Sequence, residues 1–156
     1  MELSDNLKKQ NILLKASSNN RWDLIEEMVD LAVKNKEIDQ EDCVEVKKAL
    51  IEREKSMSTG IGNGVAIPHC TTSRVQNTVL IVSVVTRGMD FDSIDNQPVK
   101  IVILLLVPKN KLTQHIKTLA NIAKLMSNEN LRERMLNLKS AESIIGAIRE
   151  FEKVKR

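Results

Sequence analysis

His69 follows a proline and ends a short apolar segment, Val65-Ala66-Ile67. Pro68 favours extended backbone before it and cannot donate to a central ladder. We therefore expect an edge or terminating strand, with His69 exposed just beyond the regular pairing. A neutral imidazole is a competent nucleophile near pH 7, since its unperturbed pKa is about 6.5. The pattern indicates a histidine that can take up a phosphoryl group and pass it on. A surface histidine after a tight turn is the alternative.

The loop before this segment contains Gly60, Gly62 and Gly64. Glycine adopts positive φ readily, and its missing side chain leaves room for a ligand or for the backbone of a partner. The loop therefore favours close approach of one of these beside His69.

Arg53 lies sixteen residues before His69, near the end of a predicted helix at 39–57 with Asp39 as its N-cap. It shares one helix face with apolar residues: Cys43, Val46, Leu50 and Met57. A charge on an inward face is costly unless it is paired or needed. A guanidinium grips phosphate oxygens in a bidentate fork that lysine cannot reproduce. Arg53 is thus a candidate phosphate receptor, or else an arginine whose stem packs on the core edge while its head reaches water.

The second histidine, His115, falls in the opening turn of a predicted helix at 113–126. We expect it to border the inward stripe of that helix: Ile116, Leu119, Ala120, Ala123 and Met126. A helix N-terminus favours nearby negative charge by roughly 0.3–1 kcal/mol, so a ring N–H here could help to hold a phosphate. A histidine that simply covers the core margin is the alternative.

The remaining elements predict an α/β fold. Residues 79–85 and 101–107 are apolar runs typical of central strands covered on both faces, separated by turn signals at Arg87-Gly88 and Asp95-Asn96-Gln97-Pro98. We also expect a strand at 12–15 and further helices: one capped at Asn20 and running to about residue 33, and others at about 130–138 and 141–151. This order predicts a single domain, residues 1–156 with a core at about 10–152, built on a mixed sheet with helices on both faces.

Composition narrows the class of function. A chain of 156 residues with 42% hydrophobic and 29% charged residues is typical of one globular domain. With no tyrosine, one tryptophan and two phenylalanines, it lacks the aromatic platforms that stack on single-stranded nucleic acid. The net charge of +3 is modest, and both signs of charge alternate along most helices. Nucleic-acid binding is therefore not expected.

Cysteine usage and hydropathy bear on cofactors and compartment. Cys43 and Cys70 make no disulfide framework and suit a reducing compartment. Neighbours along extended backbone point to opposite sides, so His69 and Cys70 are poorly placed to share a metal, and we expect neither metal nor other cofactor. The apolar runs are too short to span a membrane, and residues 1–10 are too polar for a signal peptide. We expect a cytoplasmic protein without membrane insertion.

These residues together resemble the enzyme IIA domains of the bacterial phosphoenolpyruvate-dependent phosphotransferase system, type 2 (the mannitol/fructose type). The resemblance spans essentially the whole chain. It lies in Glu52-Arg53-Glu54, in the segment from Ser58 through Gly64 to Pro68-His69, and in a histidine in the helix after Leu105-Leu106-Val107-Pro108. The stretch from Phe91 to Val99 is most similar to the nitrogen-regulatory branch (enzyme IIA-Ntr).

The resemblance implies a central mixed sheet of about five strands, with His69 as the phosphorylated residue. Arg53 would be its anion partner and His115 the second active-site histidine. Cys70 stands where glycine or alanine is usual, but it is also small, so phosphoryl acceptance is expected to be intact. The implied donor is the phosphohistidine of HPr, or its nitrogen-branch counterpart, without metal or nucleotide. We expect HPr to dock on an apolar rim formed by Ile61, Val65 and Ile67.

Three functions are compatible with this pattern. The first is a regulatory phosphocarrier, whose phosphorylation state alters its binding to target proteins. The second is a sugar-uptake enzyme IIA, which hands its phosphate to a fructose- or mannitol-type enzyme IIB. The third is a binding module that kept the fold and lost transfer; His69 and Arg53 argue against it. The stretch at 95–98 and the lack of a fused IIB or membrane domain favour the first.

Overall fold

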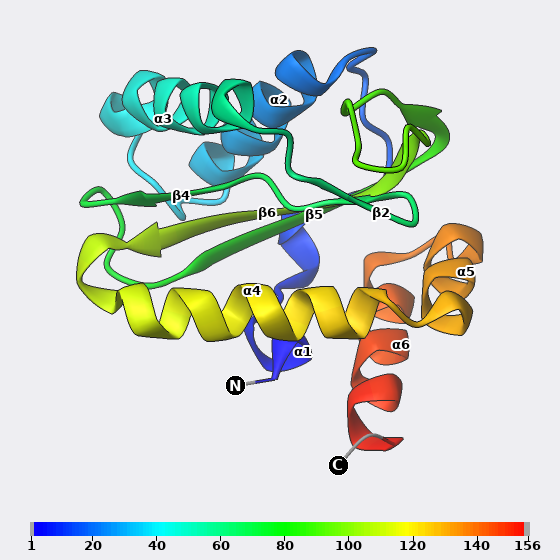
Figure 1. Ribbon diagram of the computed structural model, residues 1–156. Helices are drawn as coiled ribbons and strands as arrows, with labels where there is room; N and C mark the ends of the chain where they lie inside the picture. The colour runs from blue at the N-terminus through cyan, green and yellow to red at the C-terminus, as the bar shows by residue number, and fades with distance from the viewer. Residues whose placement is uncertain (1, 155–156) are drawn as a thin grey trace.

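The computed structural model describes residues 2–154 and contains one six-stranded mixed sheet between two layers of helices (Figure 1). The order is β1-β5-β6-β3-β2, and β4 also pairs with β6. The strands are β1 (Ile12–Leu13), β2 (Gly60–Gly62), β3 (Val65–Ala66), β4 (His69–Thr72), β5 (Val79–Met89) and β6 (Val99–Pro108). Only the pairing of β5 with β6 and of β2 with β3 is antiparallel. The predicted α/β class and mixed sheet are confirmed.

Two helices cover one face of the sheet and four cover the other (Figure 1). On the first face lie α2 (Arg21–Lys34) and α3 (Cys43–Ser56). On the second lie α1 (Leu3–Asn6), α4 (Leu112–Met126), α5 (Glu129–Asn137) and α6 (Ala141–Val154). Short 3-10 turns precede β1, α3 and α4 at Lys9–Asn11, Gln40–Asp42 and Lys109–Lys111. Within residues 2–154, no helix combines the length and apolarity needed to cross a membrane.

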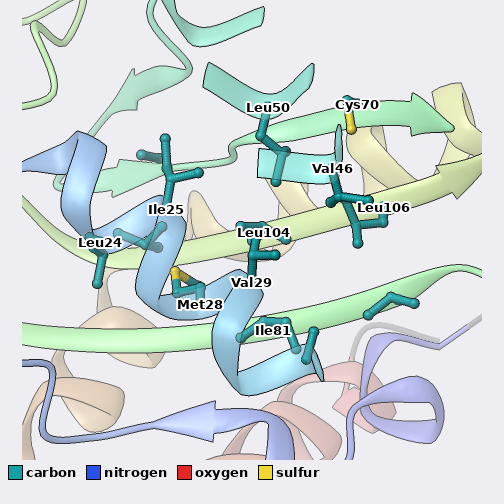
Figure 2. Close-up of a cluster of buried hydrophobic side chains, with 14 of the residues drawn as sticks. Leu24, Ile25, Met28, Val29, Val46, Leu50, Cys70, Ile81, Leu104 and Leu106 are labelled. Carbon is teal, nitrogen blue, oxygen red and sulfur yellow. The ribbon is translucent and has the colours of Figure 1, made fainter. Parts of the chain in front are cut away.

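The side chains of the central strands alternate between two buried clusters. Ile81 and Leu104 face α2 and α3, whereas Leu80 and Leu105 face the opposite helices. Figure 2 shows the first cluster, in which α2 and α3 pack on the sheet through Leu24, Ile25, Met28, Val29, Val46 and Leu50. Because both faces are buried, these strands read as continuous apolar runs instead of alternating ones.

Helix α2 begins where its cap was predicted, because the Asn20 side chain accepts a hydrogen bond from the Asp23 N–H. The α3 prediction needs two corrections. Asp39 starts a 3-10 turn, and α3 itself begins only at Cys43. Met57 lies past the helix end in extended backbone and is 69% exposed, so it does not extend the buried face.

Of the two alternatives predicted for Val65-Ala66-Ile67, the edge strand is wrong, whereas a strand that terminates before Pro68 is confirmed by the end of β3 at Ala66. Strand β3 lies between β2 and β6, and its residues are fully buried. Strands β3 and β4 follow one another along the same neighbour, from Val65 opposite Ile101 to Thr72 opposite Pro108. Pro68 interrupts this line without ending it, since its carbonyl still accepts a hydrogen bond from the Leu105 N–H. The strand at the edge next to β3 is β2.

Two further predictions differ from the structure. Arg87-Gly88 is not a turn but lies within β5, where Gly88 has φ +80° and the register with β6 shifts. A bulge and a turn can both place a residue at positive φ, so both favour glycine. The turn predicted at 95–98 lies two residues earlier, at 93–96, where the Asn96 N–H donates to the Ser93 carbonyl. The first strand is shorter than predicted, and the short helix α1 was not predicted.

The face with which helix α4 packs on the sheet shares Leu119 and Met126 with the predicted stripe and otherwise differs from it. Its buried residues are His115, Ile122, Leu125 and Met126, with Leu119 partly buried against them. Ile116 is 61% exposed, and Ala120 and Ala123 are exposed as well. Two apolar stripes lie side by side on this helix, and helical periodicity does not tell which one faces inward.

Candidate functional site

His69 is the first residue of β4 and is half-buried, in register with Leu105 of β6. The prediction that it lies exposed beyond the pairing is therefore wrong. Its Nδ1 lies 2.7 Å from the Ile67 carbonyl oxygen. Because a carbonyl oxygen can only accept, Nδ1 carries the proton in the neutral ring and Nε2 carries the lone pair.

His115 lies on the inner face of α4, 7% exposed, instead of bordering it. Its ring centroid is 5.3 Å from that of His69, with the ring planes at 50°. Its Nδ1 is buried without a hydrogen-bond partner among residues 2–154. The fold thus brings the two histidines of the chain together and leaves one ring nitrogen of His115 unsatisfied.

Arg53 is half-buried near the end of α3, and its guanidinium donates to the Met57 carbonyl at 2.9 Å. Within the described part of the chain it forms no salt bridge. Its positive charge is close enough to lower the pKa of His69. The structure therefore places the three predicted site residues in one neighbourhood, with a guanidinium that has no carboxylate partner.

Burial holds both imidazoles neutral near pH 7. Burial lowers the pKa of His69, the hydrogen bond to Ile67 opposes this, and the charge of Arg53 adds to it. Burial also lowers the pKa of His115, and the charge of His69 adds to that. Neutral imidazole is the form that has a lone pair for nucleophilic attack.

Sequence reasoning missed Glu54, which is 1% exposed and faces the same neighbourhood. Its carboxylate accepts hydrogen bonds from the Thr59 N–H (3.0 Å) and hydroxyl and pairs with Arg21 (3.3 Å). The signal was present, because Val46, Leu50 and Glu54 recur every four residues along the buried face of α3. Glu54 is thus the last buried residue of this face, and Met57 is exposed because the helix ends before it.

The glycine-rich loop does not leave space for a ligand. The loop at 91–98 packs directly on it, and a Cβ at Gly60 would lie 2.2 Å from the Ser93 Oγ. Gly62, Asn63 and Gly64 have positive φ and turn the chain between β2 and β3. These glycines therefore serve the hairpin and its packing.

The predicted apolar rim also needs correction. Val65 and Ile67 are buried, and only Ile61 is exposed, at 44%. The exposed apolar side chains beside the site are instead Met57, next to the Arg53 guanidinium, and Leu112 and Ile116, which neighbour His115 on α4.

Cys70 points away from His69 into the cluster beneath α2 and α3, as the extended backbone predicts. Burial raises the pKa of its thiol to about 11, so it remains protonated. Among residues 2–154, no group of three or more His, Cys, Asp or Glu side chains is arranged to hold a metal ion.

Comparison with known proteins places this geometry in context. The family described as "Phosphoenolpyruvate-dependent sugar phosphotransferase system, EIIA 2" matches residues 5–151. A "Nitrogen regulatory protein" of Bradyrhizobium diazoefficiens is 30% identical over 148 residues, which cover 95% of each chain. The "PTS system fructose-specific EIIABC component" of Bacillus subtilis is 30% identical over 98% of this chain, which spans only 24% of that relative's length.

A solved structure of similar fold is the "Nitrogen Regulatory Protein IIA-Ntr" of Neisseria meningitidis. It has a TM-score of 0.85 and 29% sequence identity, and the match covers 94% of this chain and 98% of that one. The likeness extends over the sheet and both helical layers, because little of either chain is left out.

Proposed function

The chain belongs to the EIIA type 2 family of the phosphoenolpyruvate-dependent sugar phosphotransferase system, and on that premise we propose that it is a phosphocarrier that becomes phosphorylated on His69. The observation that carries the proposal is the pairing of the His69 Nδ1–H with the Ile67 carbonyl, which leaves the lone pair on Nε2, near a guanidinium that has no carboxylate partner among the described residues. The donor is the phosphohistidine of HPr or of its nitrogen-branch counterpart.

In this transfer, the Nε2 lone pair of His69 attacks the phosphorus of the donor's phosphohistidine. A new N–P bond forms as the donor's N–P bond breaks, and the electron pair of the broken bond returns to the donor ring. No proton has to move in this step, because Nδ1 keeps the one that it shares with Ile67. The His69 ring then carries both N–P and N–H and one positive charge. Since one N–P bond replaces another, the reaction is close to thermoneutral and depends on positioning and charge stabilisation.

Two side chains are placed to stabilise the incoming group. A phosphoryl group carries roughly −1.5 to −2 charges, and a partly exposed ion pair at contact distance contributes on the order of 1–4 kcal/mol. Arg53 has donors beyond the one held by Met57, and His115 has a buried ring nitrogen without a partner. We assign Arg53 the bidentate grip and His115 a hydrogen bond to the bound group.

The relatives support two downstream roles. We favour a regulatory phosphocarrier in the cytoplasm, because the IIA-Ntr structure and the nitrogen regulatory protein of Bradyrhizobium diazoefficiens each match nearly the whole chain. Its phosphorylation state would then alter its binding to target proteins. The fructose-specific relative supports the second role, in which the phosphate passes to an enzyme IIB. We expect either kind of partner to dock over Met57, Leu112 and Ile116, since these are exposed next to the site.

The test is phosphorylation of purified protein by phosphoenolpyruvate, enzyme I and HPr, followed by intact mass. Wild type should gain one phosphoryl group that is labile in acid, as an N–P bond is. His69→Ala should gain none, while its far-UV circular dichroism stays that of wild type. Labelling that persists in His69→Ala refutes the assignment. Nitrogen NMR of the labelled ring should report Nε2 as the modified atom.

A further inference from the structure

We propose that Glu54 is a positioning residue of this site, which fixes the bend at 57–59 and through that bend holds both Arg53 and His69 in place for transfer. The inference rests on the proposed phosphocarrier function. Glu54 would contact neither the phosphoryl group nor the reacting nitrogen. It would act through hydrogen bonds that lead from its carboxylate to the two residues that do.

The carboxylate lies where α3 ends and the chain turns toward β2. It accepts from the Thr59 N–H at 3.0 Å and from the Thr59 hydroxyl, and so closes the segment at 54–59. Arg21 at the start of α2 pairs with it at 3.3 Å and also donates to the Phe91 carbonyl at 2.6 Å. Ser58 donates to the same carbonyl. Glu54 therefore ties the bend to α2, while Ser58 and Arg21 tie it to the loop at 91–98.

One path leads from this bend to the nucleophile. The Thr59 carbonyl accepts from the Ile67 N–H at 3.0 Å. The Ile67 carbonyl in turn accepts from His69 Nδ1 at 2.7 Å. Because this last bond sets the tautomer and the ring orientation, a shift of Thr59 would be transmitted to the direction of the Nε2 lone pair.

A second path leads to the anion receptor. The Met57 carbonyl, two residues before Thr59, accepts from the Arg53 guanidinium at 2.9 Å. Freed from Met57, a long flexible side chain would lose its fixed orientation toward His69. The same bend thus sets the geometry of both partners, and misplacement by about 1 Å can slow a reaction on the order of a hundredfold.

The charge of Glu54 has a separate effect. The groups that act electrostatically on His69 are Arg53, which lowers its pKa, and Glu54, which raises it, while His115 is its neutral neighbour. After transfer the His69 ring is positively charged, so a nearby buried anion stabilises the product. An amide at position 54 keeps the shape and removes this charge.

The test compares Glu54→Gln with Glu52→Gln, which removes an exposed carboxylate from the same helix. We expect Glu54→Gln to lower the rate of phosphoryl acceptance about tenfold or more, with the KM for phospho-HPr within about twofold of wild type. The His69 pKa, measured by NMR in the unphosphorylated protein, should fall. Amide hydrogen exchange at Thr59 and Ile67 should quicken. Glu52→Gln should match wild type in all of these.

A second pair of variants covers the case in which Glu54→Gln does not fold. Thr59→Val removes the hydroxyl bond but keeps the Glu54–Arg21 pair, so the rate should fall while the His69 pKa stays near that of wild type. Thr59→Ser restores the hydroxyl and should recover the rate that Thr59→Val loses. A wild-type rate and an unchanged His69 pKa in Glu54→Gln would overturn the positioning role. Wild-type protein that takes up no phosphate would refute the phosphocarrier function instead. The His69 pKa and the amide exchange at Thr59 and Ile67 would still test whether Glu54 holds the bend.

Discussion

The two sides of the site differ in how completely their polar groups are satisfied. On the α3 side, formed by Arg53, Glu54 and residues 57–59, the buried carboxylate has three donors and the guanidinium a carbonyl acceptor. On the α4 side, formed by Leu112, His115 and Ile116, a buried ring nitrogen lacks a partner and two apolar side chains are exposed. The cap residue before α4, Lys111, also gives its N-terminus no side-chain hydrogen bond.

This difference indicates a division of labour. A fully bonded side is rigid before any ligand arrives, and preorganised groups cost little reorganisation when charge develops. A side with an unsatisfied nitrogen and exposed apolar surface is stabilised when something binds to it. We infer that the α3 side sets the geometry of transfer and supplies the grip of Arg53, and that the α4 side is completed only when the phosphoryl group and the partner that brings it are bound.

The largest effect should come from Arg53→Lys on the α3 side. Lysine keeps the charge, but one ammonium on a flexible stem cannot both bond the Met57 carbonyl and grip two phosphate oxygens. We expect the acceptance rate to fall about tenfold or more, which corresponds to roughly 1.4 kcal/mol in the barrier. Single-turnover transfer from phospho-HPr measures this rate. A near-wild-type rate would make Arg53 a structural residue and remove the contrast between the two sides.

On the α4 side, His115→Leu should have two smaller effects of opposite sign, a gain in stability and a loss of activity. Leaving a buried polar atom unbonded costs about 1–3 kcal/mol, so replacement by an apolar side chain should raise the free energy of unfolding by about 1 kcal/mol. Acceptance should slow a few-fold, because one donor to the phosphoryl group is lost. Urea unfolding and the same transfer assay measure the two quantities. Loss of both stability and activity would mean that His115 stabilises the fold by packing and that its ring nitrogens are already hydrogen-bonded.

Much of the fold was predictable, because apolar runs and helix caps depend on residues that are close together in the sequence. Asn20 shows its cap in the sequence, and the runs at 79–85 and 101–107 could only be buried strands. The site residues were found through their chemistry and their resemblance to a family. The predictions that failed concern the end of α3, the inward face of α4 and the surroundings of the glycine-rich loop. Met57 was expected on the inward face, but α3 ends before it. The glycines were expected to admit a ligand or the backbone of a partner, but the loop at 91–98 of the same chain packs there. Such choices depend on contacts distant in sequence, which periodicity does not contain.

The smallest effect concerns pH. In the folded chain the pKa values of His69 and His115 are lowered, so the unfolded chain binds protons first as pH falls. The stability that neutral imidazoles contribute is fully present above the unfolded pKa of about 6.5 and is lost as pH drops through the lowered folded values. Unfolding free energies measured by urea between pH 7.5 and 5 should therefore decline in wild type and decline less in His115→Leu. Shifted carboxylates do not obscure this window, because the pKa values of Glu27 and Asp95 are lowered and they titrate below it. Parallel curves for the two proteins would show that His115 is as well solvated as any surface histidine, and the α4 side would then need no ligand to complete it.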